Sequence, residues 1–253
     1  MKRAAVSLVM LSSLIYLGLC ALLFVTQSSF IYIPRAASVA HANSAITLSV
    51  AGAEVAVSHR AHRGRKALIY FGGNAEDVSA SLKGFARAFP DHALYLMHYR
   101  GYGGSTGSPS QAHLFADALA LHEQVMARHS QITVIGRSLG SGIATYLASQ
   151  RPVSRLLLIT PYDSIANVAA GRLPMFPVHW LLLDKYESWR YAPQITAPTR
   201  ILAAEHDDVI PRLHTDALLR HFSPGIATLH VIPGTRHNTI SADPGYLALL
   251  RAG

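Results

Sequence analysis

Short apolar runs alternate with amphipathic helical patterns along the chain from residue 66 onward. Apolar runs of about four to eight residues bounded by turn residues are typical of buried strands, whereas apolar residues at helical spacing indicate a helix that covers a core. Strands and helices in this order form βαβ units. The sequence therefore predicts an α/β fold with a mainly parallel central sheet and helices on both of its faces.

The individual elements follow from the same patterns. Two alternating runs between Ile46 and Val57 predict an antiparallel hairpin at one edge of the sheet. The strands expected after it are Ala67–Phe71, Ala93–Tyr99, Ile132–Ile135, Leu156–Ile159, Thr199–Ala203 and Ala227–Ile232. The expected helices are Asp77–Phe89, Gln111–His129, Ser138–Ser149, Arg212–Phe222 and Pro244–Arg251.

The composition limits the class of protein. Of the 253 residues, 50% are hydrophobic and 14% are charged, which excludes a disordered chain and a coiled coil and suits one α/β domain. The one cysteine, Cys20, excludes a disulfide framework and a thiolate zinc site. A net charge of +8 suits either an anionic membrane surface or nucleic acid and does not choose between them.

The amino-terminal segment carries no charge from Ala4 to Val25 and is long enough, at about 1.5 Å per residue, to span a bilayer core of ~30 Å. We expect residues 1–33 to form a membrane anchor and residues 34–253 to form the folded body. Lys2 and Arg3 place the amino terminus in the cytoplasm and the body outside, in the periplasm of a Gram-negative cell. The alternative is a signal peptide cleaved between residues 38 and 42, although its apolar core would be unusually long.

One segment interrupts the alternation. Residues 162–190 contain two prolines and a bulky apolar cluster, so we expect a short helical cap inserted above the sheet. In that cap, Phe176 and Trp180 are the candidate substrate-binding side chains, because a contiguous apolar patch is seldom left to water. The basic stretch His59–Lys66 is expected to be a solvated turn, with contact to phospholipid head groups as the alternative.

The pentapeptide Gly136–Gly140 has the pattern G-x-S-x-G and lies between an apolar strand and a helical pattern. This is the setting of a nucleophile elbow, in which a tight turn between small residues exposes the serine hydroxyl above the sheet. Ser138 is therefore the candidate nucleophile. The backbone amide of Leu139, at the helix start, is the first candidate oxyanion donor.

A serine nucleophile needs a base within hydrogen-bond reach and an acid that holds the base. His237 follows a strand end and is the candidate base. Asp207 and Asp208 follow another strand end and compete for the acid role; Asp207 is favoured because it stands four residues before Pro211. Strand carboxyl ends in open α/β sheets meet at one edge, where such sheets place their sites.

Glycines after the strand that ends at Phe71 allow the backbone to approach a ligand closely, and the backbone amide of Asn74 is the second candidate oxyanion donor. The alternative is a plain glycine turn before a helix. The chain contains no Walker loop, dinucleotide fingerprint or paired metal-ligand motif. We therefore expect no cofactor, no metal and no nucleic-acid partner.

Six segments appear in the order FGGNAED, HYRGYGGSTGSPS, GRSLGSG, TPYDSI, EHDDVIP and GTRHN. In this order they resemble the serine hydrolases of the α/β-hydrolase fold, and most closely their single-pass, membrane-anchored subgroup, from about Gln27 to the end of the chain. The resemblance implies Ser138, Asp207 and His237 as the catalytic triad, with the Leu139 and Asn74 amides as the oxyanion hole. One departure is Gly72, which replaces a histidine that supports the oxyanion loop in the family.

These observations predict a membrane-anchored serine hydrolase that cleaves carboxylic esters or thioesters of lipid-like acyl groups. One alternative is a serine peptidase or amidase that uses the same triad, with Asp163, Asp184 or Glu187 of the insertion binding a substrate amine. The other alternative is a non-catalytic binding scaffold of the same fold. The sequence gives no indication of the oligomeric state.

Overall fold

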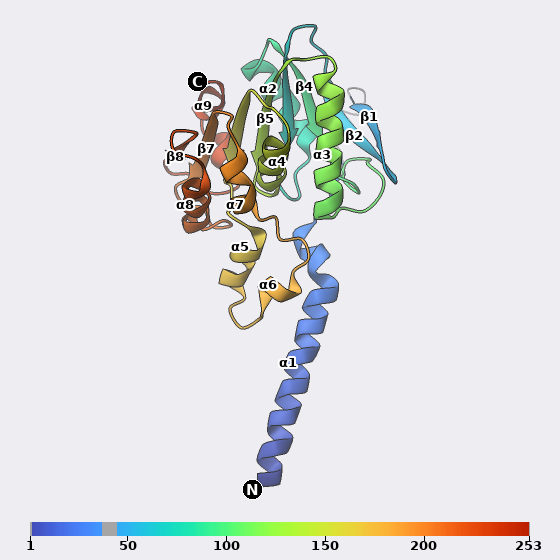
Figure 1. Cartoon of the computed structure of the whole chain (residues 1–253), viewed down its shortest axis with the longest axis vertical. Coiled ribbons are helices and arrows are strands. Elements are labelled where there is room, and N and C mark those ends of the chain that lie inside the picture. The colour runs from blue at the N-terminus through green and yellow to red at the C-terminus, as the bar shows by residue number, and fades with distance from the viewer. Residues whose placement is uncertain (1, 37–44, 253) are drawn as a thin grey trace.

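The computed structural model describes residues 2–36 and 45–252, and its central feature is one eight-stranded sheet (Figure 1). The strand order is β1-β2-β4-β3-β5-β6-β7-β8. The first hairpin is antiparallel, β2 also pairs antiparallel with β4, and all later pairs are parallel. The strands are β1 (Ala45–Val50), β2 (Ala53–Arg60), β3 (Lys66–Phe71), β4 (His92–Met97), β5 (Gln131–Arg137), β6 (Arg155–Ile159), β7 (Thr199–Ala204) and β8 (Ala227–Ile232).

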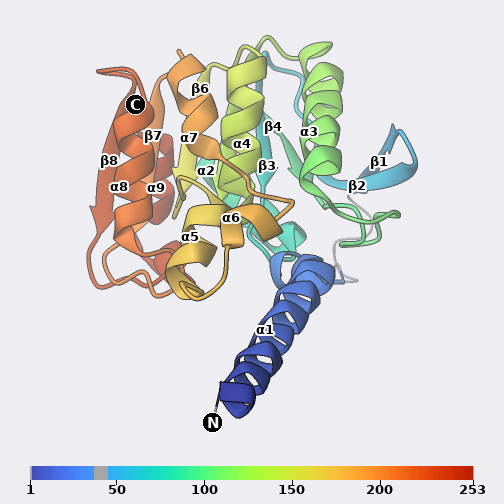
Figure 2. The same cartoon turned by 60° about the horizontal axis from the view of Figure 1, so that its bottom comes forward.

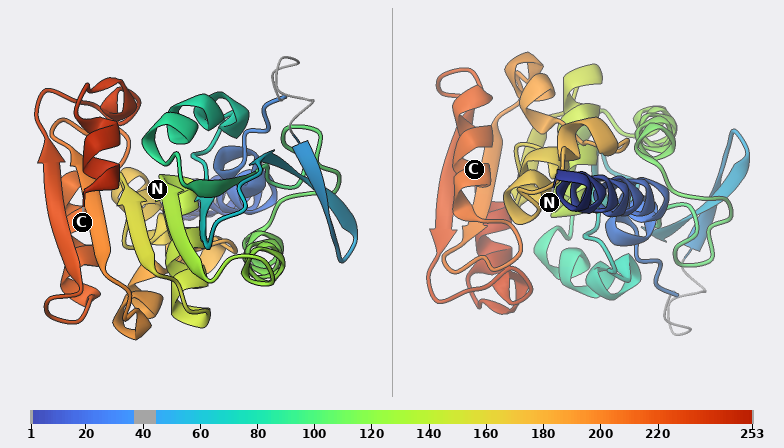
Figure 3. Two further views of the ribbon diagram at one scale, coloured as in Figure 1. Left: turned by 90° about the horizontal axis from the view of Figure 1, so that it is seen from above. Right: turned by 90° about the horizontal axis from the view of Figure 1, so that it is seen from below.

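Helices cover both faces of this sheet (Figure 3). One face carries α2 and α9, and the other carries α3, α4, α7 and α8. The helices of the body are α2 (Leu82–Ala88), α3 (Gln111–Met126), α4 (Leu139–Gln150), α5 (Ile165–Arg172), α6 (Val178–Leu181), α7 (Ser188–Tyr191), α8 (Arg212–His221) and α9 (Tyr246–Arg251). This is the α/β-hydrolase fold, and it confirms the α/β architecture predicted from the sequence.

Two apolar cores sandwich the sheet because successive side chains of a strand point to opposite faces. Strand β3 illustrates this alternation. Ala67, Ile69 and Phe71 join the core under α3 and α4, whereas Leu68 and Tyr70 join the core under α2 and α9. A strand that is buried on both sides reads as a continuous apolar run, which is the pattern seen in the sequence.

The amino-terminal helix α1 (Lys2–Ile31) extends away from the body (Figures 1 and 2). Among the described residues it is the one helix long and apolar enough to cross a membrane. Most of its side chains are exposed, but Gln27 and Ile31 near its end are buried against the body. The signal-peptide cleavage sites considered between residues 38 and 42 lie outside the described residues.

The cap predicted at residues 162–190 contains α5, α6 and α7, of which α5 and α6 lie beside the end of α1 that meets the body (Figures 1 and 2). Helix α7 belongs instead to the layer that packs on α4. Within the insertion, α5 and α6 therefore form the cap, and α7 belongs to the helical layer on the sheet. Only the stretch from α5 to α6 stands above the edge of the sheet where Ser138 lies.

Several boundaries differ from those predicted; helix α3, for example, ends at Met126 rather than at His129. Strand β4 ends at Met97 rather than at Tyr99, and the helix expected from Asp77 starts as a short 3₁₀ turn before α2. The basic stretch expected to be a solvated turn begins inside β2. There Arg60 donates hydrogen bonds to the carbonyls of Ala86 and Phe89, at 3.0 and 2.8 Å. The last carbonyls of a helix have no partner within it, so the Arg60 guanidinium caps the end of α2. The rest of the stretch, residues 61–66, is mostly exposed, as expected of a solvated turn.

Candidate active site

The turn from β5 into α4 holds Ser138 in a strained conformation with φ 49° and ψ −117°. A non-glycine residue adopts a positive φ only where its surroundings impose it. Here a Cβ at Gly136 would lie 2.4 Å from the Gly140 carbonyl oxygen, and a Cβ at Gly140 would lie 2.1 Å from that of Phe71. The two glycines therefore permit the tight turn that lifts the serine hydroxyl above the sheet.

The three residues predicted as a triad come together at this edge. His237 Nε2 lies 2.9 Å from the Ser138 hydroxyl, and His237 Nδ1 lies 2.9 Å from the nearer carboxylate oxygen of Asp207. The side chains of His237 and Asp207 are both almost fully buried. In a site that excludes water these polar contacts are stronger than they are in solvent. This geometry suits transfer of the serine proton to the imidazole.

The spacing between Asp207 and Pro211 has a local cause. The Asp207 carboxylate accepts hydrogen bonds from the backbone amides of Val209 and Ile210, at 2.9 and 2.7 Å, which close a turn directly before Pro211. Asp208 is exposed and points instead to Arg236, 3.5 Å away. The structure therefore brings Asp207, and not Asp208, to the imidazole.

The backbone amides of Leu139 and Asn74 have no acceptor among the described residues, and both residues line the same cavity as Ser138. Leu139 is the first residue of α4, where the amide lacks a helical partner and the helix dipole favours negative charge. Asn74 lines the same cavity as Ser138. Its side-chain oxygen accepts hydrogen bonds from the Ile33 amide and the Tyr102 hydroxyl, both at 2.9 Å, which hold the loop in place.

The departure at Gly72 is explained by the residues around it. A Cβ at position 72 would lie 2.4 Å from Val78 Cγ1, so a histidine does not fit there unless Val78 moves. The loop is supported by Glu76, whose carboxylate accepts a hydrogen bond from the Gly73 amide at 2.7 Å. On the other side, the Tyr99 hydroxyl donates to the Gly72 carbonyl at 2.6 Å.

Glu76 also joins the oxyanion loop to the rest of the site. It accepts a hydrogen bond from the Tyr70 hydroxyl at 2.7 Å and pairs with Arg137 at 3.2 Å, and Arg137 donates to the His237 carbonyl at 3.3 Å. Burial, with the Glu76 carboxylate beside it, raises the pKa of Tyr70 well above its usual range, so the phenol remains a neutral donor. Sequence reasoning missed Glu76 and Arg137. The available signal was an acidic residue three positions after Gly73 and a basic one beside Ser138.

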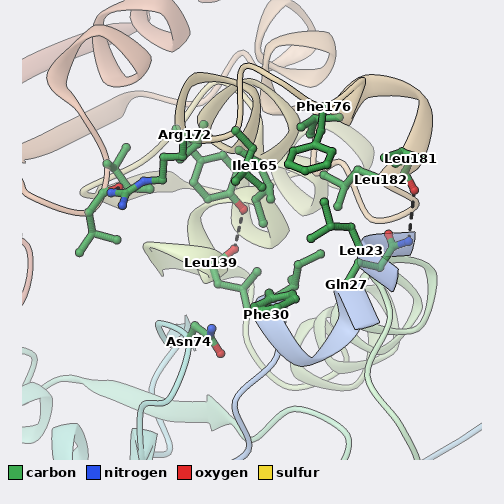
Figure 4. A pocket seen from close by; sticks show the side chains of 18 of the residues that line it. Leu23, Gln27, Phe30, Asn74, Leu139, Ile165, Arg172, Phe176, Leu181 and Leu182 are labelled. Carbon is green, nitrogen blue, oxygen red and sulfur yellow. Dashed lines mark hydrogen bonds between the residues drawn. The ribbon is translucent and has the colours of Figure 1, made fainter. Parts of the chain in front are cut away.

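A cavity of about 560 Å³ opens next to Ser138 (Figure 4). Its volume is within the range of small-molecule binding sites. Its lining residues are mostly apolar and come from α1, the nucleophile elbow and the cap. They are Leu23, Gln27, Phe30, Ile31, Asn74, Ser138, Leu139, Tyr162, Ile165, Val168, Ala169, Arg172, Leu173, Phe176, Val178, Leu181, Leu182, Val209 and Ile210.

The two cap residues predicted to bind substrate differ in position. Phe176 lines the cavity and faces the end of α1 (Figure 4). Trp180 is 88% exposed and is not among the lining residues, so its assignment to the cavity is wrong. The reason is local. Helix α6 is only four residues long, and it turns Val178 and Leu181 inward while Trp180 points out.

Comparison with known proteins agrees with this fold. A family model described as alpha/beta hydrolase fold matches residues 66–181. An uncharacterised protein of Mycobacterium tuberculosis is 32% identical over 260 residues, which cover 94% of this chain and 90% of that protein. The chain belongs to the α/β-hydrolase family.

More distant relatives show how widely the likeness extends. Lysophosphatidylserine lipase ABHD12 of Xenopus tropicalis is 31% identical over 182 residues, which cover 60% of this chain and 47% of that protein. The chain thus matches less than half of the lipase. Among solved structures, alpha/beta hydrolase domain-containing protein 10 from mouse has a TM-score of 0.64 at 16% identity, covering 82% of this chain and 95% of that one. At that identity the likeness shows the fold alone.

Proposed function

We propose that the protein is a serine hydrolase that cleaves carboxylic esters with lipid-like acyl groups. The observation that carries this proposal is one continuous hydrogen-bonded array, from Asp207 through His237 to Ser138, at the wall of an apolar cavity. A thioester of the same acyl group offers the same carbonyl to the serine. The catalytic roles of Leu139 and Asn74 as oxyanion donors belong to the same proposal.

The reaction follows from the positions of these groups. His237 Nε2 takes the proton of the Ser138 hydroxyl as its oxygen attacks the ester carbonyl carbon, and the amides of Leu139 and Asn74 hold the resulting oxyanion. Collapse of this intermediate breaks the bond to the alcohol, which leaves with the proton from His237. Water then attacks the acyl-enzyme in the same way, releasing the acid and restoring Ser138.

Three features support a lipid-like substrate. The cavity next to Ser138 is lined by aliphatic and aromatic side chains, and apolar residues of α1 and of the cap both contribute to it. Helix α1 has the length and composition of a membrane-spanning helix. A relative that matches 60% of this chain is a lysophosphatidylserine lipase. An ester with one long acyl chain satisfies all three.

The contacts of the carboxylates in the insertion favour an ester substrate over a peptide substrate. The three carboxylates considered for binding a substrate amine do not line the cavity. Asp163 is paired with His214 at 2.8 Å, Asp184 accepts a hydrogen bond from Tyr32 at 2.7 Å, and Glu187 is paired with Arg190 at 3.0 Å. These groups are already paired, and no carboxylate lines the cavity in the part of the chain that the structure describes, so burial of a charged amino terminus there is costly.

We also propose that residues 1–33 anchor the catalytic body, residues 34–253, in a membrane. Lys2 and Arg3 precede the apolar run, and the next basic residue is Arg35, so the charge bias favours a cytoplasmic amino terminus and an extracytoplasmic body. In a Gram-negative cell that location is the periplasm. The proposal treats the segment as a retained anchor rather than a cleaved signal peptide.

The test is a substrate screen with the full-length protein in detergent. We expect turnover of p-nitrophenyl esters and acyl thioesters that exceeds turnover of aminoacyl anilides, and loss of about 10⁴-fold or more in Ser138→Ala. Preference for the anilides would instead indicate a peptidase or amidase. Failure of a fluorophosphonate probe to label the folded wild-type protein would indicate a scaffold without catalytic activity.

A further inference from the structure

One face of α1 forms a wall of the cavity. Leu23, Gln27, Phe30 and Ile31 all line it, and their spacing of four, three and one residues places them on the same side of a helix. Figure 4 shows Leu23 and Phe30 opposite Phe176 of the cap. The helix that has the composition of a membrane anchor therefore also contributes to the space next to Ser138.

The position of α1 against the cap is set by a buried polar side chain. Gln27 is 8% exposed, donates to the Leu181 carbonyl at 3.1 Å and accepts from the Leu183 amide at 2.7 Å. A buried amide without partners is unfavourable, and here both ends of the amide are paired with cap backbone. The Gln27 contacts therefore define both the rotation of α1 and its height along the cap.

Contacts on either side of Gln27 extend this docking. Toward the amino terminus, the Tyr16 hydroxyl donates to the Met175 carbonyl at 2.8 Å, and the Tyr16 ring stacks on Phe176 at 5.8 Å. Toward the body, the Ile33 amide donates to the Asn74 side chain at 2.9 Å. From Tyr16 to Ile33 this docked stretch is about 25 Å long at 1.5 Å per residue. The part of α1 from Tyr16 onward is thus docked on the cap and the oxyanion loop, whereas its first half extends away from the body.

If α1 spans the membrane, the position of these contacts along the helix places part of the cap within the hydrocarbon layer. A hydrocarbon core of ~30 Å needs about 20 helical residues, so a span that starts after Arg3 ends near Leu23. Tyr16 then lies roughly 10 Å inside the end of the span, and its contacts Met175 and Phe176 lie there with it. Met175 is 77% exposed, and the neighbouring Trp180 is exposed further still. Apolar side chains at that exposure suit contact with acyl chains better than contact with water.

From this arrangement we infer that the end of α1 is a substrate-binding element, and that an ester with one acyl chain reaches Ser138 from the membrane leaflet between α1 and the cap. The acyl chain lies against Leu23 and Phe30 of α1 and Phe176 of the cap, and the ester carbonyl lies at Ser138. This inference rests on the proposed ester hydrolase activity. It goes beyond that activity because it assigns part of the acyl-binding wall to the anchor helix itself.

The first experiment compares two neighbouring tryptophan variants of the full-length protein in lipid nanodiscs. Leu23→Trp places bulk in the cavity, whereas Leu22→Trp adds the same bulk at a position that is 57% exposed and outside the cavity lining. We expect Leu23→Trp to lower kcat/KM for p-nitrophenyl palmitate at least tenfold and that for p-nitrophenyl acetate less than twofold. Leu22→Trp changes neither by more than twofold. Equal palmitate turnover in the two variants overturns the inference.

Leu23→Trp could lose activity because the larger side chain disturbs folding. Leu23→Ala tests the same position without adding bulk. We expect this variant to shift the preferred acyl length upward, and a profile identical to that of the wild type contradicts the inference. Loss of acetate and palmitate turnover in equal proportion in both Leu23 variants also contradicts it.

A second experiment does not depend on turnover. Ser138→Ala protein in nanodiscs is irradiated with a monoacylglycerol that carries a diazirine in its acyl chain, and the adducts are mapped by mass spectrometry. We expect adducts on Leu23 and Phe176 in addition to the outward-facing Leu22 and Val25. Adducts on the outward-facing residues alone overturn the inference. If the wild-type protein hydrolyses no ester but Leu23 and Phe176 are labelled, the proposed activity fails while the binding role of α1 stands.

Discussion

Both carboxylate oxygens of Asp207 lie within hydrogen-bond distance of His237 Nδ1, at 3.0 and 2.9 Å. An acid in this position fixes the imidazole tautomer and stabilises the imidazolium that forms during attack. Asp207→Asn is therefore expected to lower kcat for an ester substrate by about 10⁴-fold. Asp208→Asn is the matched control and should stay within about twofold, because exposed substitutions away from the reacting groups have small effects. The reverse ranking, measured by steady-state kinetics, would assign the acid role to Asp208.

Glu76 is expected to act as a positioning residue for the oxyanion loop. Glu76→Ala leaves the Gly73 amide and the Tyr70 hydroxyl without their acceptor, so the Asn74 amide loses its fixed position. We expect kcat to fall on the order of 10–100-fold with little change in KM, which is less than the loss of a direct oxyanion donor. Glu76→Gln retains an acceptor oxygen and should recover most of kcat. If the two variants lose kcat equally, or if KM rises in place of the fall in kcat, Glu76 does not act through the loop.

The cap residues Phe176 and Trp180 should separate in their effects. Phe176→Ala removes part of the cavity wall and is expected to lower the ratio of palmitate to acetate turnover several-fold. Trp180→Ala leaves that ratio unchanged in detergent because the ring lies outside the cavity. The measurement is the ratio of the two kcat/KM values for each variant. If the palmitate-to-acetate ratio falls in Trp180→Ala but not in Phe176→Ala, the cap must change its orientation when substrate binds, so that Trp180 faces the cavity.

Stability should fall as the pH drops below about 6.5, the ordinary pKa of histidine. His122 is fully buried, its Nε2 donates to the Pro152 carbonyl at 3.0 Å, and burial lowers its pKa. The unfolded state therefore binds a proton that the folded state does not, and one such group changes the free energy of unfolding by at most ~1.4 kcal/mol per pH unit.

His122→Gln keeps a donor for Pro152 but cannot titrate. The slope of Tm against pH between pH 7 and 5, measured in detergent by circular dichroism, should be shallower in this variant than in the wild type. An unchanged slope in His122→Gln would mean that other groups control acid unfolding.

Membrane topology can be tested with a reporter fused after Gly253. Alkaline phosphatase, which is active only outside the cytoplasm, should be active in this fusion, and a cytoplasmic reporter at the same position should not. The protein should also resist extraction by carbonate, as a retained transmembrane helix requires. A soluble mature form that begins near Ala40 or Asn43 would show that the segment is a cleaved signal peptide.

Much of the fold could be predicted because strands buried on both faces read as apolar runs, and residues 67–71 are an example. Ends of elements were less predictable. Tyr99 continues the apolar pattern of β4 but has left the strand, and its hydroxyl bonds to the Gly72 carbonyl. Arg60 reads as part of a basic surface stretch, yet the carbonyls at the end of α2 hold it in place. Such partners are distant in the sequence, so local patterns do not reveal them.

The candidate triad could be predicted because its residues follow strand ends that one sheet edge must bring together. The supporting residues could not. Glu76 after a glycine turn reads as an ordinary start of a helix, and its contact with Arg137 depends on two strands that are neighbours only in the folded sheet. Trp180 is a candidate substrate-binding residue because it belongs to an apolar cluster, but the direction in which a four-residue helix points its side chains follows from its docking and not from their apolar character.

The hydrogen bonds of Gln27 to the cap have a consequence for the evolution of this chain. If α1 is the proposed membrane anchor, a generic apolar helix in its place would serve the same purpose, but it would lack the amide that aligns the cap and the side chains that line the cavity. On the two proposals, attachment needs only the length and apolar composition of α1, whereas selectivity needs particular side chains on one face of it, so selectivity can change while attachment is kept. Exchange of the anchor between relatives would transfer part of the substrate preference along with it.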